Sequence, residues 1–176
     1  MGLLDWVRKK NYEVCCNEAD RCFDEYIKNY DKWISTHLDK YFLKALNSSK
    51  KSERTFSKAI NLDKDKPYAY ARLASLYDSV GELQYIHLND EKTKIELYKA
   101  AVKLLDRAIK LTNDPKEKAE LHYQKSRNLG GLGLKKQSAE ARRMADTLVP
   151  GFTKKNLERN IEIMEKTIEE FKSQKK

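Results

Sequence analysis

The sequence has few of the residues that interrupt helices. Its 176 residues include six glycines and three prolines, and the apolar residues recur at spacings of three and four, with no sustained alternation. The shortage of turn residues and of alternating patterns excludes a sandwich or barrel of short strands. The sequence therefore predicts an all-α protein.

Cysteine is also scarce, and its placement argues against a disulfide framework. The three cysteines Cys15, Cys16 and Cys22 lie close together near the start, and an odd number matches no such framework. Together with His37 they could supply metal ligands, but the paired spacings typical of zinc sites are absent. We interpret Cys22 as a small hydrophobic residue on a helix face, and expect neither a metal nor a cofactor.

Long hydrophobic runs and targeting signals are missing as well. No segment approaches the roughly 20 apolar residues that span a bilayer, and "MGLLDWVRKK" has neither a long apolar core nor a cleavage site. Trp6 stands where a myristoylation signal requires Ser or Thr. We expect a cytoplasmic protein that does not contact membranes.

The few histidines give no support to an enzyme. His37, His87 and His122 have no acid or nucleophile at the spacing of a triad, and the chain has no glycine-rich phosphate loop. His37 lies on a predicted apolar face, and His122 takes a predicted packing position. We expect structural histidines and no catalysis.

Helix boundaries are marked where polar and turn residues do occur. An apolar stripe predicts a long helix from 19 to 46, with Asn29 or Asp31 as places for a break and the Asn-Ser-Ser at 47–49 as its end. A shorter helix follows around 56–62. Asp114, Pro115 and Glu117 form a strong helix start, with Asp114 as the cap and Glu117 completing a capping box.

One stretch carries a family pattern. On a first helix the pattern has Tyr70, Leu73, Ala74, Tyr77 and Gly81, and on a second it has Ala101, Leu105 and Ala108, followed by Pro115. This order resembles the tetratricopeptide repeat. The resemblance implies antiparallel helix pairs stacked as a short superhelix, in which Ala74 and Ala101 are small because two helices touch there.

The resemblance divides the single helical repeat domain 1–176 into five parts. These are an N-terminal helical segment 1–32, a divergent repeat 33–66, the best-matching repeat 67–115, a second matching repeat 116–150 and a capping helix 151–176. The best repeat carries an insertion at about 83–97. We expect Asn89 or Asp90 to cap a second helix that extends two turns beyond its partner, while 83–88 packs back or forms an exposed contact surface.

The resemblance also implies a binding groove. In such repeats the first helices line a concave face that holds peptides or helices of other proteins. The match places on that face Tyr68, Ala71, Ser75, Asp78, Ser79, Tyr123, Gln124, Arg127 and Asn128. We take Tyr68, Ser75, Asp78, Tyr123, Gln124 and Arg127 as the candidate partner-binding residues, with Arg127 as the anion contact. The alternatives are a solvated groove or one filled by the protein's own end helix.

Charge supports a rival interpretation. The net charge is +9, and residues 116–155 hold ten Lys and Arg against four acids. A basic region of this kind attracts nucleic acid or acidic ligands. No nucleic-acid motif accompanies it, so we predict an adaptor that binds another protein or peptide and keep nucleic-acid binding as the alternative.

The last helix carries a narrow apolar stripe. Its members recur at spacings of 4, 3, 4 and 3, and they are Leu157, Ile161, Met164, Ile168 and Phe171. Such a stripe fits a cap on the final repeat or a short coiled coil between two copies. We predict the cap, and hence a monomer, with a dimer through this helix as the alternative.

Overall fold

The described part of the chain consists of seven helices and no strands. The computed structural model describes residues 2–173, without the side chains of residues 3–5, 167, 168 and 170–173. The helices are α1 (Leu3–Thr36), α2 (Asp39–Leu62), α3 (Pro67–Leu88), α4 (Glu91–Leu111), α5 (Pro115–Gly131), α6 (Lys135–Leu148) and α7 (Phe152–Ser173). This confirms the predicted all-α class.

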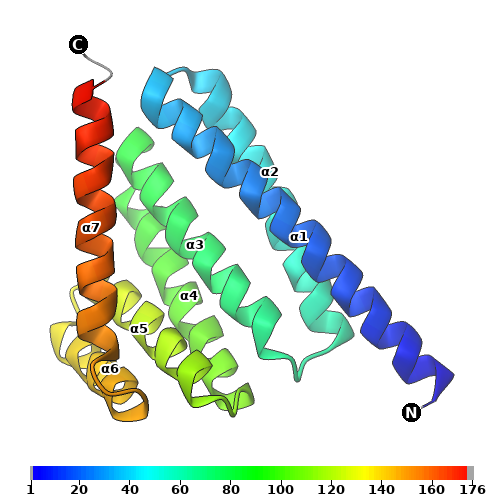
Figure 1. The fold of residues 1–176 in the computed structure, drawn as a ribbon. Coiled ribbons are helices and arrows are strands. Elements are labelled where there is room, and N and C mark those ends of the chain that lie inside the picture. The colour runs from blue at the N-terminus through cyan, green and yellow to red at the C-terminus, as the bar shows by residue number, and fades with distance from the viewer. Residues whose placement is uncertain (1, 174–176) are drawn as a thin grey trace.

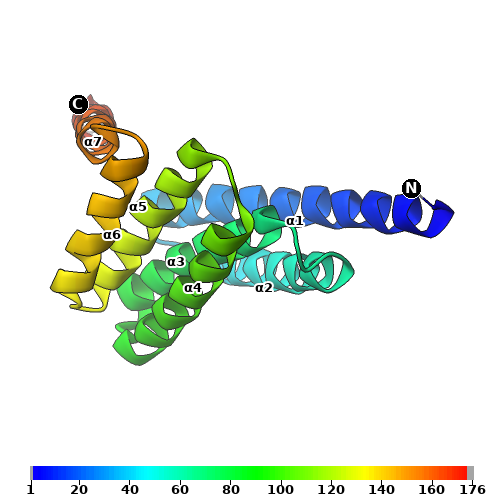
Figure 2. The same ribbon diagram turned by 90° about the horizontal axis from the view of Figure 1, so that it is seen from below.

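The helices form three hairpins and a final single helix. Helices α1 and α2, α3 and α4, and α5 and α6 pack as pairs, and α2 contacts α3 as α4 contacts α5. The hairpins lie side by side, so that α1, α3, α5 and α7 all run in the same sense along the molecule (Figures 1 and 2). The second hairpin is therefore held between the other two.

The first turn of the chain lies at residues 37–38, which corrects the sequence prediction. Helix α1 passes through Asn29 and Asp31 and ends where His37 adopts the left-handed conformation, with φ of 52° and its N–H donating to the Trp33 carbonyl oxygen. His37 is exposed rather than on the apolar face. No glycine or proline marks this turn.

Helix α2 continues through the Asn-Ser-Ser at 47–49, where the sequence predicted an end. The Ser49 hydroxyl donates to the Leu46 carbonyl oxygen within the helix. The buried Ser52 hydroxyl donates to the Ala19 carbonyl oxygen of α1 at 2.9 Å. The Ser49 hydroxyl is thus satisfied within the helix, and Ser52 joins α2 to α1.

The largest hydrophobic cluster joins the first three helices. Its buried aromatic members are Tyr12, Phe23, Tyr26, Trp33, Phe42 and Phe56. The Tyr26 hydroxyl donates to the Ser79 carbonyl oxygen at 2.7 Å, so the polar end of a fully buried ring is satisfied on α3. Cys15, Cys16 and Cys22 are free and buried, as the interpretation of Cys22 predicts.

The segment 83–97 lengthens both helices of the second hairpin. Asp90 caps α4 as predicted, because its carboxylate accepts from the Thr93 N–H at 3.0 Å. Helix α3, however, runs to Leu88, so α4 does not extend beyond its partner. Leu83 is buried, whereas Tyr85, Ile86 and Leu88 are exposed.

Small residues allow close packing around α4. Ala74 and Ala101 belong to the same buried cluster, as the sequence predicts. Tyr98 lies between α3 and α5, and a Cβ atom at Gly131 would overlap its ring. Glycine at 131 is therefore required by the position of Tyr98.

The later helix ends follow their turn residues. The Asp114 carboxylate accepts from the N–H groups of Lys116 and Glu117, which confirms the predicted cap. The capping box is not completed, because the Glu117 carboxylate accepts from the Thr112 hydroxyl instead. Gly151, with φ of 75°, turns the chain into α7.

The described residues of the stripe on α7 do not pack on the core, contrary to the predicted cap. Leu157, Ile161 and Met164 are 56%, 47% and 62% exposed, while Ile168 and Phe171 have side chains outside the described set. Phe152 at the start of α7 is the residue that enters a cluster, with Ala119, Tyr123 and Ala145.

Candidate functional site

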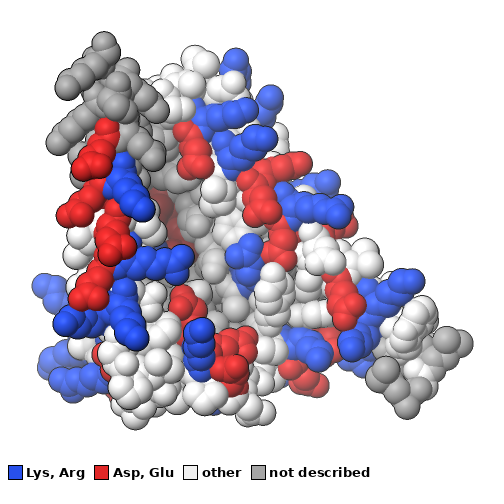
Figure 3. Space-filling view, viewed as in Figure 1, with Lys and Arg blue, Asp and Glu red and all other residues white. Residues whose placement is uncertain are grey.

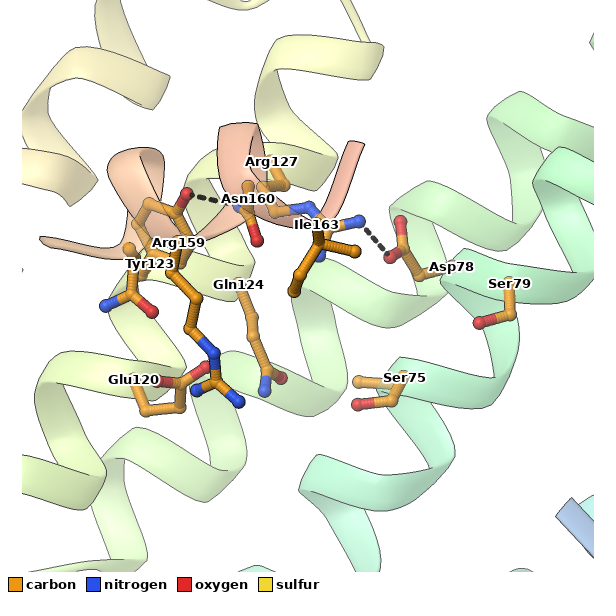
Figure 4. Close-up of a pocket in the computed structure, with 12 residues that line it drawn as sticks. Ser75, Asp78, Ser79, Glu120, Tyr123, Gln124, Arg127, Arg159, Asn160 and Ile163 are labelled. Carbon is orange, nitrogen blue, oxygen red and sulfur yellow. Dashed lines mark hydrogen bonds and ion pairs between the residues drawn. The ribbon is translucent and has the colours of Figure 1, made fainter. Parts of the chain in front are cut away.

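Helices α3, α5 and α7 enclose a cleft of about 390 Å³. It is lined by Ala74, Ser75, Asp78, Ser79, Glu120, Tyr123, Gln124, Arg127, Asn156, Arg159, Asn160 and Ile163. Side chains from the three helices approach it from different sides (Figure 4). Five of the six candidate binding residues thus lie in one place, and Tyr68 does not.

The α3 wall carries the most buried charge of the cleft. Asp78 has a side chain 18% exposed, and its Oδ2 lies 3.3 Å from an Arg127 guanidinium nitrogen. Burial raises the pKa of Asp78 above its ordinary value, and the neighbouring Arg127 opposes that rise. Ser75 donates its hydroxyl to the Ala71 carbonyl oxygen, as expected of a serine inside a helix.

Residues one turn apart form the α5 wall. Tyr123 is 9% exposed and meets the Phe152 ring edge to face at 6.2 Å, so it is a packing residue that presents its hydroxyl to the cleft. Gln124 lies beside it (Figure 4). Arg127, with a side chain 57% exposed, spans from α5 to Asp78 on α3.

The α7 wall was not predicted from the sequence. Asn160 donates from Nδ2 to the Tyr123 hydroxyl oxygen at 3.2 Å, and Arg159 reaches toward Glu120 and Gln124 (Figure 4). The sequence prediction for this helix, a cap on the final repeat, concerned its apolar stripe. Asn160 and Arg159 lie on its polar side. The possibility that the end helix enters the groove was stated only as an alternative, and α7 does form one wall of it.

Three residues expected on the concave face lie elsewhere. Tyr68 donates its hydroxyl to Asp20 of α1 at 2.7 Å, and burial together with this bond raises the pKa of Tyr68 to about 12. Ala71 packs against the cluster that contains Ala74. Asn128 is 2% exposed and donates to the Gln124 carbonyl oxygen. Tyr68 thus bonds α3 to α1, and Ala71 and Asn128 are held within the packed helices.

Charges of both signs surround the cleft. Figure 3 shows a hollow between α7 and α1, with Lys and Arg side chains interspersed with Asp and Glu along both borders. Within the basic region 116–155, three cations have carboxylate partners: Lys125 with Asp106 at 2.6 Å, Arg127 with Asp78, and Lys154 with Glu158 at 3.8 Å. Neutralisation of this kind weakens a uniform basic field.

The chemistry available in the cleft is that of hydrogen bonding. It contains no histidine or cysteine, and the described side chains include no group of three His, Cys, Asp or Glu residues arranged to hold a metal. His122 lies outside the cleft, and burial with nearby lysines lowers its pKa. The lining supplies hydroxyls, carboxamides, two carboxylates and the guanidinium groups of Arg127, which is paired with Asp78, and Arg159.

Comparisons with protein-family models, with curated proteins and with solved structures find no match to this chain. Among the helices of the described residues, none has the length and apolar character needed to cross a membrane.

Proposed function

We propose that this protein is a non-catalytic interaction module that binds an extended peptide segment of another protein in the cleft between α3, α5 and α7. The observation that carries the proposal is the convergence of Ser75, Asp78, Tyr123, Gln124 and Arg127 on a single cleft. Its volume of about 390 Å³ falls within the roughly 300–1,000 Å³ typical of ligand sites. The resemblance to tetratricopeptide repeats supports the same function.

The lining suits an extended main chain. A peptide without secondary structure carries an N–H donor and a carbonyl acceptor at nearly every residue, and each must be satisfied when it leaves water. Carboxamides supply donors and acceptors together. Gln124, Asn156 and Asn160 present three carboxamide groups on two facing helices.

The charges favour a segment with one acidic side chain rather than a polyanion. Asp78 and Glu120 stand beside Arg127 and Arg159, so the cleft holds as many carboxylates as guanidinium groups. Arg127 is engaged by Asp78, whereas the described residues include no ion pair with Arg159. Arg159 is thus the group placed to pair with a carboxylate of the ligand.

Nucleic-acid or acidic-ligand binding through residues 116–155 is the competing function. It would use lysines and arginines spread over α5, α6 and the start of α7, and would depend on charge rather than on the cleft. The two functions differ in how they respond to the position of a charge reversal.

A pair of arginine variants separates the two. A displayed library of random peptides is selected on the full chain, and binding of a selected, labelled peptide is followed by fluorescence anisotropy. Arg127→Glu removes a cleft residue, whereas Arg143→Glu makes the same charge change on the exposed side of α6. We expect Arg127→Glu to weaken peptide binding about tenfold or more, and Arg143→Glu less than about twofold.

A second cleft variant shows whether a loss of peptide binding reflects the cleft itself or only the change in net charge. Gln124→Leu leaves the net charge unchanged and removes one carboxamide, and we expect it to weaken the same peptide. Circular dichroism confirms that each variant is folded. Equal losses in the two arginine variants, together with tight, salt-sensitive binding of a single-stranded oligonucleotide, would instead assign binding to the basic region.

A further inference from the structure

The apolar stripe of α7 is exposed although its spacing is that of a helix interface. Leu157, Ile161 and Met164 are 56%, 47% and 62% exposed, and the sequence repeats the spacing at Ile168 and Phe171. Contiguous exposed apolar residues of this kind mark a surface that another molecule covers. The stripe lies outside the cleft, so its partner is not the cleft ligand.

The body of the protein does not provide that cover. Helix α7 is attached through Phe152 in its first turn and through the Asn160 contact with Tyr123. Asn156 and Ile163 face the cleft, and at 3.6 residues per turn the stripe lies about a third of a turn around the helix from this side. None of the three described stripe residues lines the cleft.

We propose that the stripe is a dimer interface, in which α7 pairs in parallel with α7 of a second copy of this chain. The 4-3-4-3 spacing places Ile161 and Ile168 at the a positions of a heptad and Leu157, Met164 and Phe171 at the d positions. In parallel coiled coils, β-branched residues at a with leucine at d favour two strands, and here both a positions are isoleucine and Leu157 stands at a d position. A two-fold axis sets such a stripe against itself, so one sequence supplies both sides of the interface.

The flanking residues select the parallel direction. In a parallel pair, Asn160 at g faces Glu165 at e of the other copy, so no like charges meet there. In an antiparallel pair centred on Met164, Glu165 of one copy would face Glu165 of the other. Repulsion at the centre of so short an interface disfavours that direction.

The interface spans two heptads, so the dimer is reversible and depends on concentration. Sedimentation velocity of the full chain, from about 1 µM to about 1 mM, measures it directly. We expect the mass to rise from that of the 20.6 kDa chain toward twice that value. A parent that stays monomeric over the whole range would overturn the proposal.

Two isoleucines on the same helix provide a matched pair of variants. Ile161→Asp places a charge in the stripe, and Ile163→Asp places the same charge on the cleft side of the helix, where the parent residue has nearly the same exposure, 52% against 47%. We expect Ile161→Asp to raise the dimer dissociation constant at least about tenfold, and Ile163→Asp to associate like the parent. Equal effects of the two variants, or none from Ile161→Asp, would contradict a stripe interface.

A cysteine variant tests the direction of the pair. In the parallel arrangement residue 157 of one copy lies beside residue 157 of the other, so Leu157→Cys forms an intermolecular disulfide under mild oxidation. The native cysteines are buried, and the parent serves as the control on a non-reducing gel. Dimerisation without cross-linking at 157 would overturn the parallel direction.

Discussion

Helices α3 and α7 are each 22 residues long, yet they are held in different ways. Helix α3 contacts α1, α2, α4 and α5 and buries Leu73, Leu76 and Leu83. Helix α7 contacts α6 and enters the core through Phe152. Both sequences are apolar at helical spacing, so periodicity identifies a helix with an apolar side but does not say which molecule covers that side.

Leucine truncation gives the largest expected difference between these helices. Leu83 is fully buried, so Leu83→Ala leaves a cavity and should lower the free energy of unfolding by about 2–5 kcal/mol. Leu157 is 56% exposed, and Leu157→Ala should change that free energy by less than about 0.5 kcal/mol.

Urea denaturation of both variants measures this difference. The protein is kept dilute, because association of α7 with a second copy would add stability by mass action. A cost for Leu157→Ala as large as that for Leu83→Ala would show that the stripe packs within one chain after all.

Two adjacent glycines test how tightly the end of α5 packs against Tyr98 of α4. A Cβ atom at Gly131 would overlap the ring of Tyr98, whose hydroxyl donates to Glu82. Because that ring is buried and tethered, Gly131→Ala should lower the free energy of unfolding by about 1–3 kcal/mol.

Gly130 provides the control for this variant. The nearest atom to a Cβ at Gly130 is the Ser138 hydroxyl oxygen at 3.6 Å, an ordinary contact. Gly130→Ala should therefore be neutral, or stabilising by up to about 1 kcal/mol through its better helix propensity. Thermal melts of the two variants give the comparison, and similar melting temperatures would show that Tyr98 moves aside.

The parts of the fold that were predictable are those with local chemical signals. Pro67, the Asp114 cap and Gly151 mark helix boundaries in the sequence, and the structure has boundaries there. The turn at 37–38 has no such signal, because His37 adopts a left-handed conformation without being glycine. The serines at 48–49 resemble a helix end, but α2 continues through them, and the Ser49 hydroxyl bonds to the Leu46 carbonyl oxygen of the same helix.

The candidate site, like the fold, has residues that could be predicted from the sequence and residues that could not. The α3 and α5 residues of the cleft could be predicted because they recur at helical spacing on two helices that the sequence itself indicates. The contribution of Asn156, Arg159 and Asn160 could not be predicted. It depends on the direction in which α7 leaves Gly151 and on the packing of Phe152 in its hydrophobic cluster. Such a direction is set by tertiary contacts, which no local pattern encodes.

The smallest expected effect concerns Asp78, on the α3 side of the cleft. Burial raises the pKa of this carboxyl above its ordinary value of 3.8, so just above pH 3.8 the folded chain holds a proton that the unfolded chain has lost. Between pH 3.8 and the raised pKa of the folded state, the free energy of unfolding must therefore fall as pH rises. Below pH 3.8 the carboxyl is protonated in both states, so burial of its charge costs nothing. Asp78→Asn does not titrate, so the unfolding free energy of the parent minus that of the variant should decrease from pH 3.8 upward, by at most about 1 kcal/mol.

Arg127→Gln removes the positive charge that opposes the rise in the pKa of Asp78, and should extend the decrease in stability to higher pH. Urea titrations at a series of pH values measure both variants against the parent. A parent that gains stability relative to Asp78→Asn as pH rises would show that the ion pair with Arg127 outweighs the cost of burial.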